Sequence, residues 1–168
     1  MSGNVRMTVL HLAGGHVLAA VTTSASLEPD VAALTGSSHL AVAAKEPAVR
    51  VEVPAAELTA ITLTGPDAVL DDSRFYAVTD VGGPAVVLVP STGSVSLTVS
   101  GAQVVVAGGP DGAAFVAVLM TAGGATVARG TLDADTSTND TVITSPGGAI
   151  TAALVAPTGA RCIVAAAP

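Results

Sequence analysis

Residues 78–100 read VTDVGGPAVVLVPSTGSVSLTVS, and this stretch indicates the fold class of the chain. It holds two apolar runs, 84–89 and 94–99, each of a length that suits a β-strand. In the second run valine and leucine alternate with serine and threonine, the pattern of a strand with one buried and one hydrated face. Because a Pro-Ser-Thr-Gly segment at 90–93 joins the two runs, we expect them to pair as a β-hairpin.

A similar phrase, ITSPGGAITAALVAPTGARCIVAA, returns at 143–166 near the end of the chain. Gly-Gly doublets begin at Gly14, Gly82, Gly108, Gly123 and Gly147. Such recurrence suggests one hairpin used several times, with a pseudo-repeat of 7–100 and 103–166. The alternative is that the same turn chemistry arose independently at each hairpin.

Turn signals recur through the rest of the chain at intervals of about 8 to 12 residues, which is typical of sandwiches and barrels. We count about 12 to 14 short strands from these signals, with one or two helical turns, at 31–34 and near 68–73. A length of 168 residues suits one domain. The sequence therefore predicts an all-β fold, an antiparallel β-sandwich or barrel-like single β domain over residues 1–168.

The composition is unusual for a soluble domain. Apolar residues make up 50% of the chain, yet aromatic residues make up only 2% and charged residues 11%, against about 25% charged residues in ordinary domains. Alanine and valine must form most of the core, and each buries less area than leucine or phenylalanine. A thin core and a weakly charged exterior favour burial between subunits, although a general bias toward alanine, glycine and valine is the alternative. We expect an oligomer or a part of a larger assembly.

The charge of the chain argues against nucleic acid as a partner. The net charge is −7, and the six basic residues are scattered along the chain, whereas binding of nucleic acid needs clustered lysine and arginine. The uncharged stretches 7–27 and 81–110 are broken by glycine, and the second also by proline, so we expect strands and turns there rather than membrane-spanning helices. We also expect no export signal and synthesis in the cytoplasm.

Catalytic constellations are hard to find in this sequence. The three histidines are His11, His16 and His39, and no G-x-S-x-G motif is present. His11 and His16 flank the first predicted turn and could approach each other, but no acidic or cysteine ligand lies near them. Cys162 is the single cysteine and sits in an apolar run, so we expect an inert core thiol. We therefore expect no enzyme.

Two weaker site hypotheses remain. Asp133, Asp135, Ser137 and Asn139 alternate along a polar run and could direct several oxygens to a calcium ion. The run lacks the glycine and the distal glutamate of an EF-hand loop, so a solvated loop is the competing interpretation. The adjacent pair Phe75 and Tyr76 faces opposite ways if extended, which predicts one core residue and one interface anchor.

These observations predict a non-enzymatic structural module whose partners are further copies of itself and other subunits of a larger assembly. A bacteriophage capsid or tail that the chain decorates or cements, with the chain incorporated in the virion, is the example we expect, by analogy. The alternative is a binding or adhesion module, with or without calcium, that recognises a surface glycan or protein.

Overall fold

The computed structural model describes residues 3–24, 30–43, 49–89, 95–133 and 140–168. These residues form fourteen strands and four short helices, and the strand pairs are antiparallel. The predicted all-β class is therefore confirmed. None of the helices in these ranges has the length and apolar character that crossing a membrane requires.

The chain divides into two compact units. Unit 1 comprises Met1–Leu40 and Pro54–Val89, and unit 2 comprises Ala41–Val53 and Pro90–Pro168. Compactness does not show that either unit folds alone, so the single domain over residues 1–168 stays a prediction.

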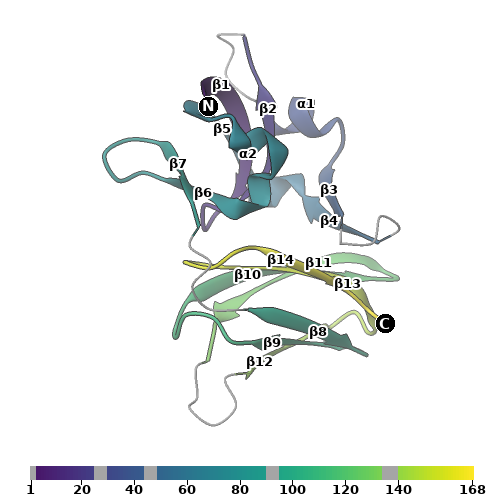
Figure 1. The fold of residues 1–168 in the computed structure, drawn as a ribbon. Coiled ribbons are helices and arrows are strands. Elements are labelled where there is room, and N and C mark those ends of the chain that lie inside the picture. The colour runs from purple at the N-terminus through teal and green to yellow at the C-terminus, as the bar shows by residue number, and fades with distance from the viewer. Residues whose placement is uncertain (1–2, 25–29, 44–48, 90–94, 134–139) are drawn as a thin grey trace. The chain divides into compact units, whose positions relative to one another are not determined.

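Unit 1 is built on a three-stranded sheet in the order β2-β1-β5 and on a separate two-stranded sheet, β6-β7 (Figure 1). The strands of unit 1 are β1 (Asn4–Leu12), β2 (Val17–Thr22), β5 (Leu58–Pro66), β6 (Tyr76–Thr79) and β7 (Ala85–Leu88). The predicted first hairpin is confirmed as β1-β2, with an irregularity in register between Leu10 and His11.

The core of unit 1 lies between these two sheets. Met7, Val9 and Val17 are fully buried there, and half-buried side chains from β6 and β7 pack against them. Gly15, in the β1-β2 turn, joins the first hairpin to β6, because its carbonyl accepts the N–H of Val78 at 2.7 Å. Gly15 has a φ of +92°, and a Cβ there would lie 2.5 Å from the carbonyl oxygen of Val78, so only glycine fits this approach.

Short helices connect the strands of unit 1. The helix α1 (Val31–Thr35) begins where the Asp30 side chain accepts the N–H of Ala32 at 3.0 Å, and it ends at Gly36, whose φ is +66°. The other helical segments are η1 (Ala55–Glu57), α2 (Ala68–Asp71) and η2 (Ser73–Phe75). The helical turns predicted near 31–34 and 68–73 are both present.

Unit 2 contains a four-stranded sheet in the order β11-β10-β13-β14 and a three-stranded sheet in the order β12-β9-β8. Their strands are β8 (Ser96–Ser100), β9 (Gln103–Ala107), β10 (Ala114–Thr121), β11 (Gly124–Thr131), β12 (Asp140–Thr144), β13 (Ile150–Pro157) and β14 (Ile163–Ala166). The two-stranded sheet β3 (His39–Ala43) and β4 (Arg50–Pro54) lies mostly within unit 2. There the N–H of Glu52 donates to the sulfur of Met120 at 3.3 Å.

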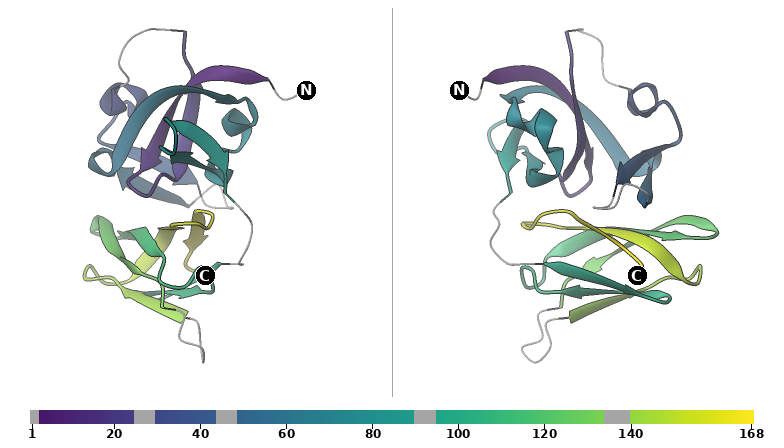
Figure 2. Two further views of the ribbon diagram at one scale, coloured as in Figure 1. Left: turned by 90° about the vertical axis from the view of Figure 1, so that its left-hand side faces the viewer. Right: turned by 45° about the vertical axis from the view of Figure 1, so that its right-hand side comes forward.

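The two larger sheets of unit 2 bury one shared core. Val104 and Val106 of β9 and Ala117, Leu119 and Ala153 of the other sheet are fully buried in the same cluster. The sheets lie as two layers in Figure 1 and in the right-hand view of Figure 2. A sandwich or barrel for the chain as a whole stays a prediction.

The predicted hairpin between 84–89 and 94–99 is wrong. Both runs contain strands, but β7 pairs with β6, β8 pairs with β9, and the two strands belong to different units. Each strand has a partner across a tighter glycine turn, at Gly82-Gly83 for β7 and at Gly101 for β8. Glycine adopts the positive φ that these turns require, which favours pairing across them.

The pseudo-repeat of 7–100 and 103–166 would separate β8 from β9, which pair in one sheet. The division into units instead falls between Val89 and Pro90. Duplication of a hairpin motif stays a prediction.

Candidate functional site

The three histidines lie in separate environments. In His11, Nδ1 lies 2.8 Å from the carbonyl oxygen of Leu12. His16 is 2% exposed. In His39, Nδ1 lies 3.5 Å from Oγ of Ser38, which is a long and solvent-exposed contact for activating a hydroxyl. The hypothesis that histidine serves as a catalytic base gains no support from this geometry.

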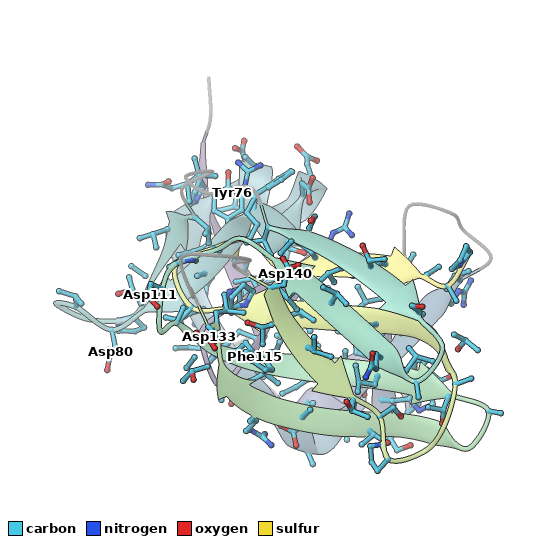
Figure 3. All side chains as sticks on the ribbon, turned by 90° about the horizontal axis from the view of Figure 1, so that it is seen from below. Tyr76, Asp80, Asp111, Phe115, Asp133 and Asp140 are labelled. Carbon is cyan, nitrogen blue, oxygen red and sulfur yellow. The ribbon has the colours of Figure 1, made fainter. Side chains whose placement is uncertain are left out.

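The candidate calcium run is described only at its two ends. Asp133 donates its backbone N–H to Oγ1 of Thr141 at 2.9 Å. This hydrogen bond joins the first residue of the run to a residue just beyond its end. Figure 3 labels Asp133 and Asp140, which lie at these ends. Asp135, Ser137 and Asn139 fall outside the described residues. Within the described ranges, no three acidic, histidine or cysteine side chains come together as metal ligands, and the calcium site stays a prediction.

The aromatic pair Phe75 and Tyr76 is half-buried at both positions. Tyr76, labelled in Figure 3, begins β6 and packs against the core cluster of unit 1, whereas Phe75 ends η2, so the two residues do not lie in one extended strand. Phe75 accepts the N–H of Val89 at its carbonyl, at 2.8 Å, and its role as an interface anchor stays a prediction. Cys162 is buried, as expected for a core thiol.

Exposed apolar side chains gather at one place that the sequence did not single out. Six large apolar residues of the described chain are exposed, and three of them lie on β7 or on the turn before it. These three are Val81, 91% exposed, Val87, 44% exposed, and Leu88, 60% exposed. Together with β6 we call this hairpin, residues 76–89, the arm.

The turn of the arm projects from the rest of unit 1 (Figure 1). Asp80 lies near its end, and the Asp80 side chain points away from the strands (Figure 3). From Val81 to Val89 the arm carries no charged residue. An exposed apolar edge strand without charges is a typical feature of an interaction surface.

Hydrogen bonds on the two edges of β6 fix the direction in which its backbone groups point. Val78 donates its N–H to Gly15 at 2.7 Å, so the even-numbered residues of β6 face the first hairpin. Val89 donates its N–H to the carbonyl oxygen of Phe75 at 2.8 Å. The backbone N–H and C=O groups of the odd-numbered residues in β6 and β7 therefore point toward the other strand of the pair. Successive residues of a strand direct their backbone groups to opposite edges.

On β7, this alternation leaves one edge open. Val87 lies opposite Ala77 and faces β6, so the N–H and C=O groups of Val86 and Leu88 point away from β6. The sheet that contains β7 has β6 as its only other strand within the described residues. The outer edge of β7 therefore offers two consecutive sets of donors and acceptors to a further strand.

Prolines flank the run of β7 in the sequence. Pro84 precedes the apolar run, and Pro90 follows it. Proline lacks an N–H and is found in sheets mainly on edge strands and at strand ends. Pro146 and Pro157 flank the run of the central strand β13 in the same way, so flanking prolines alone do not distinguish an edge strand from a central one.

Comparison with known proteins adds no relative to this geometry. No protein-family model, curated protein or solved structure matches the chain.

Proposed function

We propose that this chain is a non-enzymatic assembly module, a β-rich subunit that associates with further copies and with other subunits of a larger particle. The example that we propose for this particle is a bacteriophage capsid or tail, which the chain would decorate or cement. The observation that carries the proposal is the concentration of exposed apolar side chains on the uncharged part of the arm, from Val81 to Val89.

The free energy available at the arm supports this function. Fully burying a valine or leucine side chain contributes about 1.5–3 kcal/mol relative to leaving it exposed. Val81, Val87 and Leu88 are 91%, 44% and 60% exposed, so much of that contribution is unrealised in a lone chain. A partner that covers the arm would realise it.

Composition points the same way. Charged residues are 11% of the chain, and the centres of protein interfaces are depleted of charge.

Light scattering and electron microscopy test the proposal together. We expect the purified chain to have a molar mass above that of one copy at micromolar concentration, and we expect material from its source to show the chain on a particle. A stable monomer at micromolar concentration, with no larger partner recovered from the source, would contradict the proposed function.

A further inference from the structure

We infer that the outer edge of β7 pairs antiparallel with β7 of a second copy, about a two-fold axis that passes by Val87. The inference rests on the proposed function and names the surface through which copies meet. The result would be a four-stranded sheet in the order β6-β7-β7-β6, with two strands from each copy.

The register of this pairing follows from the direction of the backbone groups. Val86 and Leu88 carry the outward N–H and C=O groups of β7, because Val87 faces Ala77 of β6. A two-fold axis at Val87 places Val86 opposite Leu88 of the second copy, and Leu88 opposite Val86. Each of these two pairs exchanges two hydrogen bonds, as the bonded pairs of an antiparallel ladder do.

The absence of an N–H on proline favours this register over its neighbours. In the sequence, Pro84 and Pro90 each lie three residues from Val87. Pairing about Val87 gives the N–H and the C=O of both Val86 and Leu88 a partner. A shift of two residues in either direction would set a proline, which has no N–H, against the carbonyl of Val86 or Leu88.

A second copy is also the partner that the charges favour. The chain carries a net charge of −7, so two copies meet most easily through surfaces without charge. The arm is uncharged from Val81 to Val89. Antiparallel pairing moves the two Asp80 carboxylates to opposite ends of the new sheet, whereas parallel pairing would bring them to the same end.

The side chains of the paired strands fit this arrangement. Val87 meets its own counterpart at the axis as a non-hydrogen-bonded pair, whose Cβ atoms lie about 4.5–5.5 Å apart in antiparallel sheets. Leu88, which is 60% exposed, lies opposite Val86 of the second copy. Val87 and Leu88, the exposed apolar residues of the strand itself, therefore each gain an apolar neighbour from the second copy.

Disulfide trapping tests the register. We expect Val87→Cys to form a covalent dimer under mild oxidation, because residues in this position are close enough for a disulfide. Val81→Cys is the matched control, since Val81 is more exposed but antiparallel pairing places the two copies of its turn at opposite ends of the sheet. The wild-type chain has only the buried Cys162, and it should stay uncrosslinked.

Introducing a charge at residue 87 provides an independent test that needs no oxidation. Val87→Lys alone and Val87→Glu alone should each weaken self-association about tenfold or more, because like charges then oppose each other at the axis. An equimolar mixture of the two variants should associate again. Recovery on mixing is specific to a contact between residue 87 and itself.

The outcomes separate this inference from the proposed function. Wild-type association that Val87→Lys leaves unchanged, or equal crosslinking of Val87→Cys and Val81→Cys, overturns the β7 pairing while assembly through another surface stands. A monomeric chain recovered on a larger particle also overturns the pairing alone. A monomeric chain with no particle overturns both.

Discussion

The strands β7 and β13 have similar flanking sequences but differ in burial and in the number of neighbouring strands. Each follows a Gly-Gly turn, and each leads to a proline and a Thr-Gly pair. The strand β13 lies between β10 and β14, and all but one of its residues are buried. Among the strands that the structure describes, β7 has one neighbour, and half of its residues are exposed.

The difference shows that local sequence determines the strand, whereas the number of neighbours determines what the strand can do. With a strand on each side and a second sheet against one face, β13 is a core element of unit 2. With one edge open, β7 keeps the same apolar character without the partners that would bury it. We propose that assembly explains this contrast, because β7 of a second copy would pair with the open edge.

Truncation of one leucine in each strand should give the largest difference between the two regions. Leu154 of β13 is fully buried, and Leu154→Ala should lower the free energy of unfolding by about 2–5 kcal/mol. Leu88 of β7 is 60% exposed, and Leu88→Ala should change it by no more than about 0.5 kcal/mol. Denaturant unfolding of dilute samples followed by circular dichroism measures both values, and similar losses would remove the contrast.

The turns before the two strands should behave alike, and this prediction sharpens the comparison. Gly83 and Gly148 have φ values of +112° and +91°, and a Cβ at either position would meet nothing within 4 Å. Gly83→Ala and Gly148→Ala should therefore each cost about 1–2 kcal/mol, the strain of a left-handed backbone in a residue with a Cβ. The same unfolding experiment applies, and a much larger loss at one position would show that the turns are not equivalent.

The local part of the fold was predictable from the sequence. The strand β9 (Gln103–Ala107) lies between glycine turns at Gly101 and Gly108, and turn signals are properties of neighbouring residues. The helical turn that ends at Gly36 was predictable for the same reason. Pairing is not local, and β7 has a strand on either side of it in the sequence, so its own residues did not reveal that it pairs with β6 rather than β8.

The candidate sites were less predictable than the strands. The open edge of β7 depends on Val78 pairing with Gly15 on the far side of β6, a contact between residues far apart in the chain. The exposure of Val87 and Leu88 follows from that topology and from no feature of the run itself. The hydrogen bond between Asp133 and Thr141 could not be read from the polar run either, since it requires the residues just after β11 to lie close to the start of β12.

Exposed valines on two edge strands should separate stability from association. Val87 of β7 and Val142 of β12 are 44% and 53% exposed, so a lysine at either position should change the free energy of unfolding by no more than about 0.5 kcal/mol. Only Val87→Lys should lower the molar mass measured by sedimentation equilibrium. An equal loss of association in Val142→Lys would show that general charge, rather than the β7 edge, governs assembly.

Calcium should have the smallest effect. If the chain acts as an assembly module without a metal, millimolar calcium should leave the melting temperature unchanged, and calorimetric titration should give no heat of binding. Stabilisation by calcium that Asp133→Asn abolishes would instead support the binding module with Asp133, Asp135, Ser137 and Asn139 as ligands, because a ligand that binds only the folded chain raises its stability.

Amide hydrogen exchange on the arm tests the central claim most directly. The N–H of Val87 faces β6 and should be protected at every protein concentration. The N–H groups of Val86 and Leu88 should exchange rapidly in dilute samples and become protected as the concentration rises, because a second β7 then accepts them. Rapid exchange of Val86 and Leu88 at all concentrations, while the chain is associated, would contradict the account.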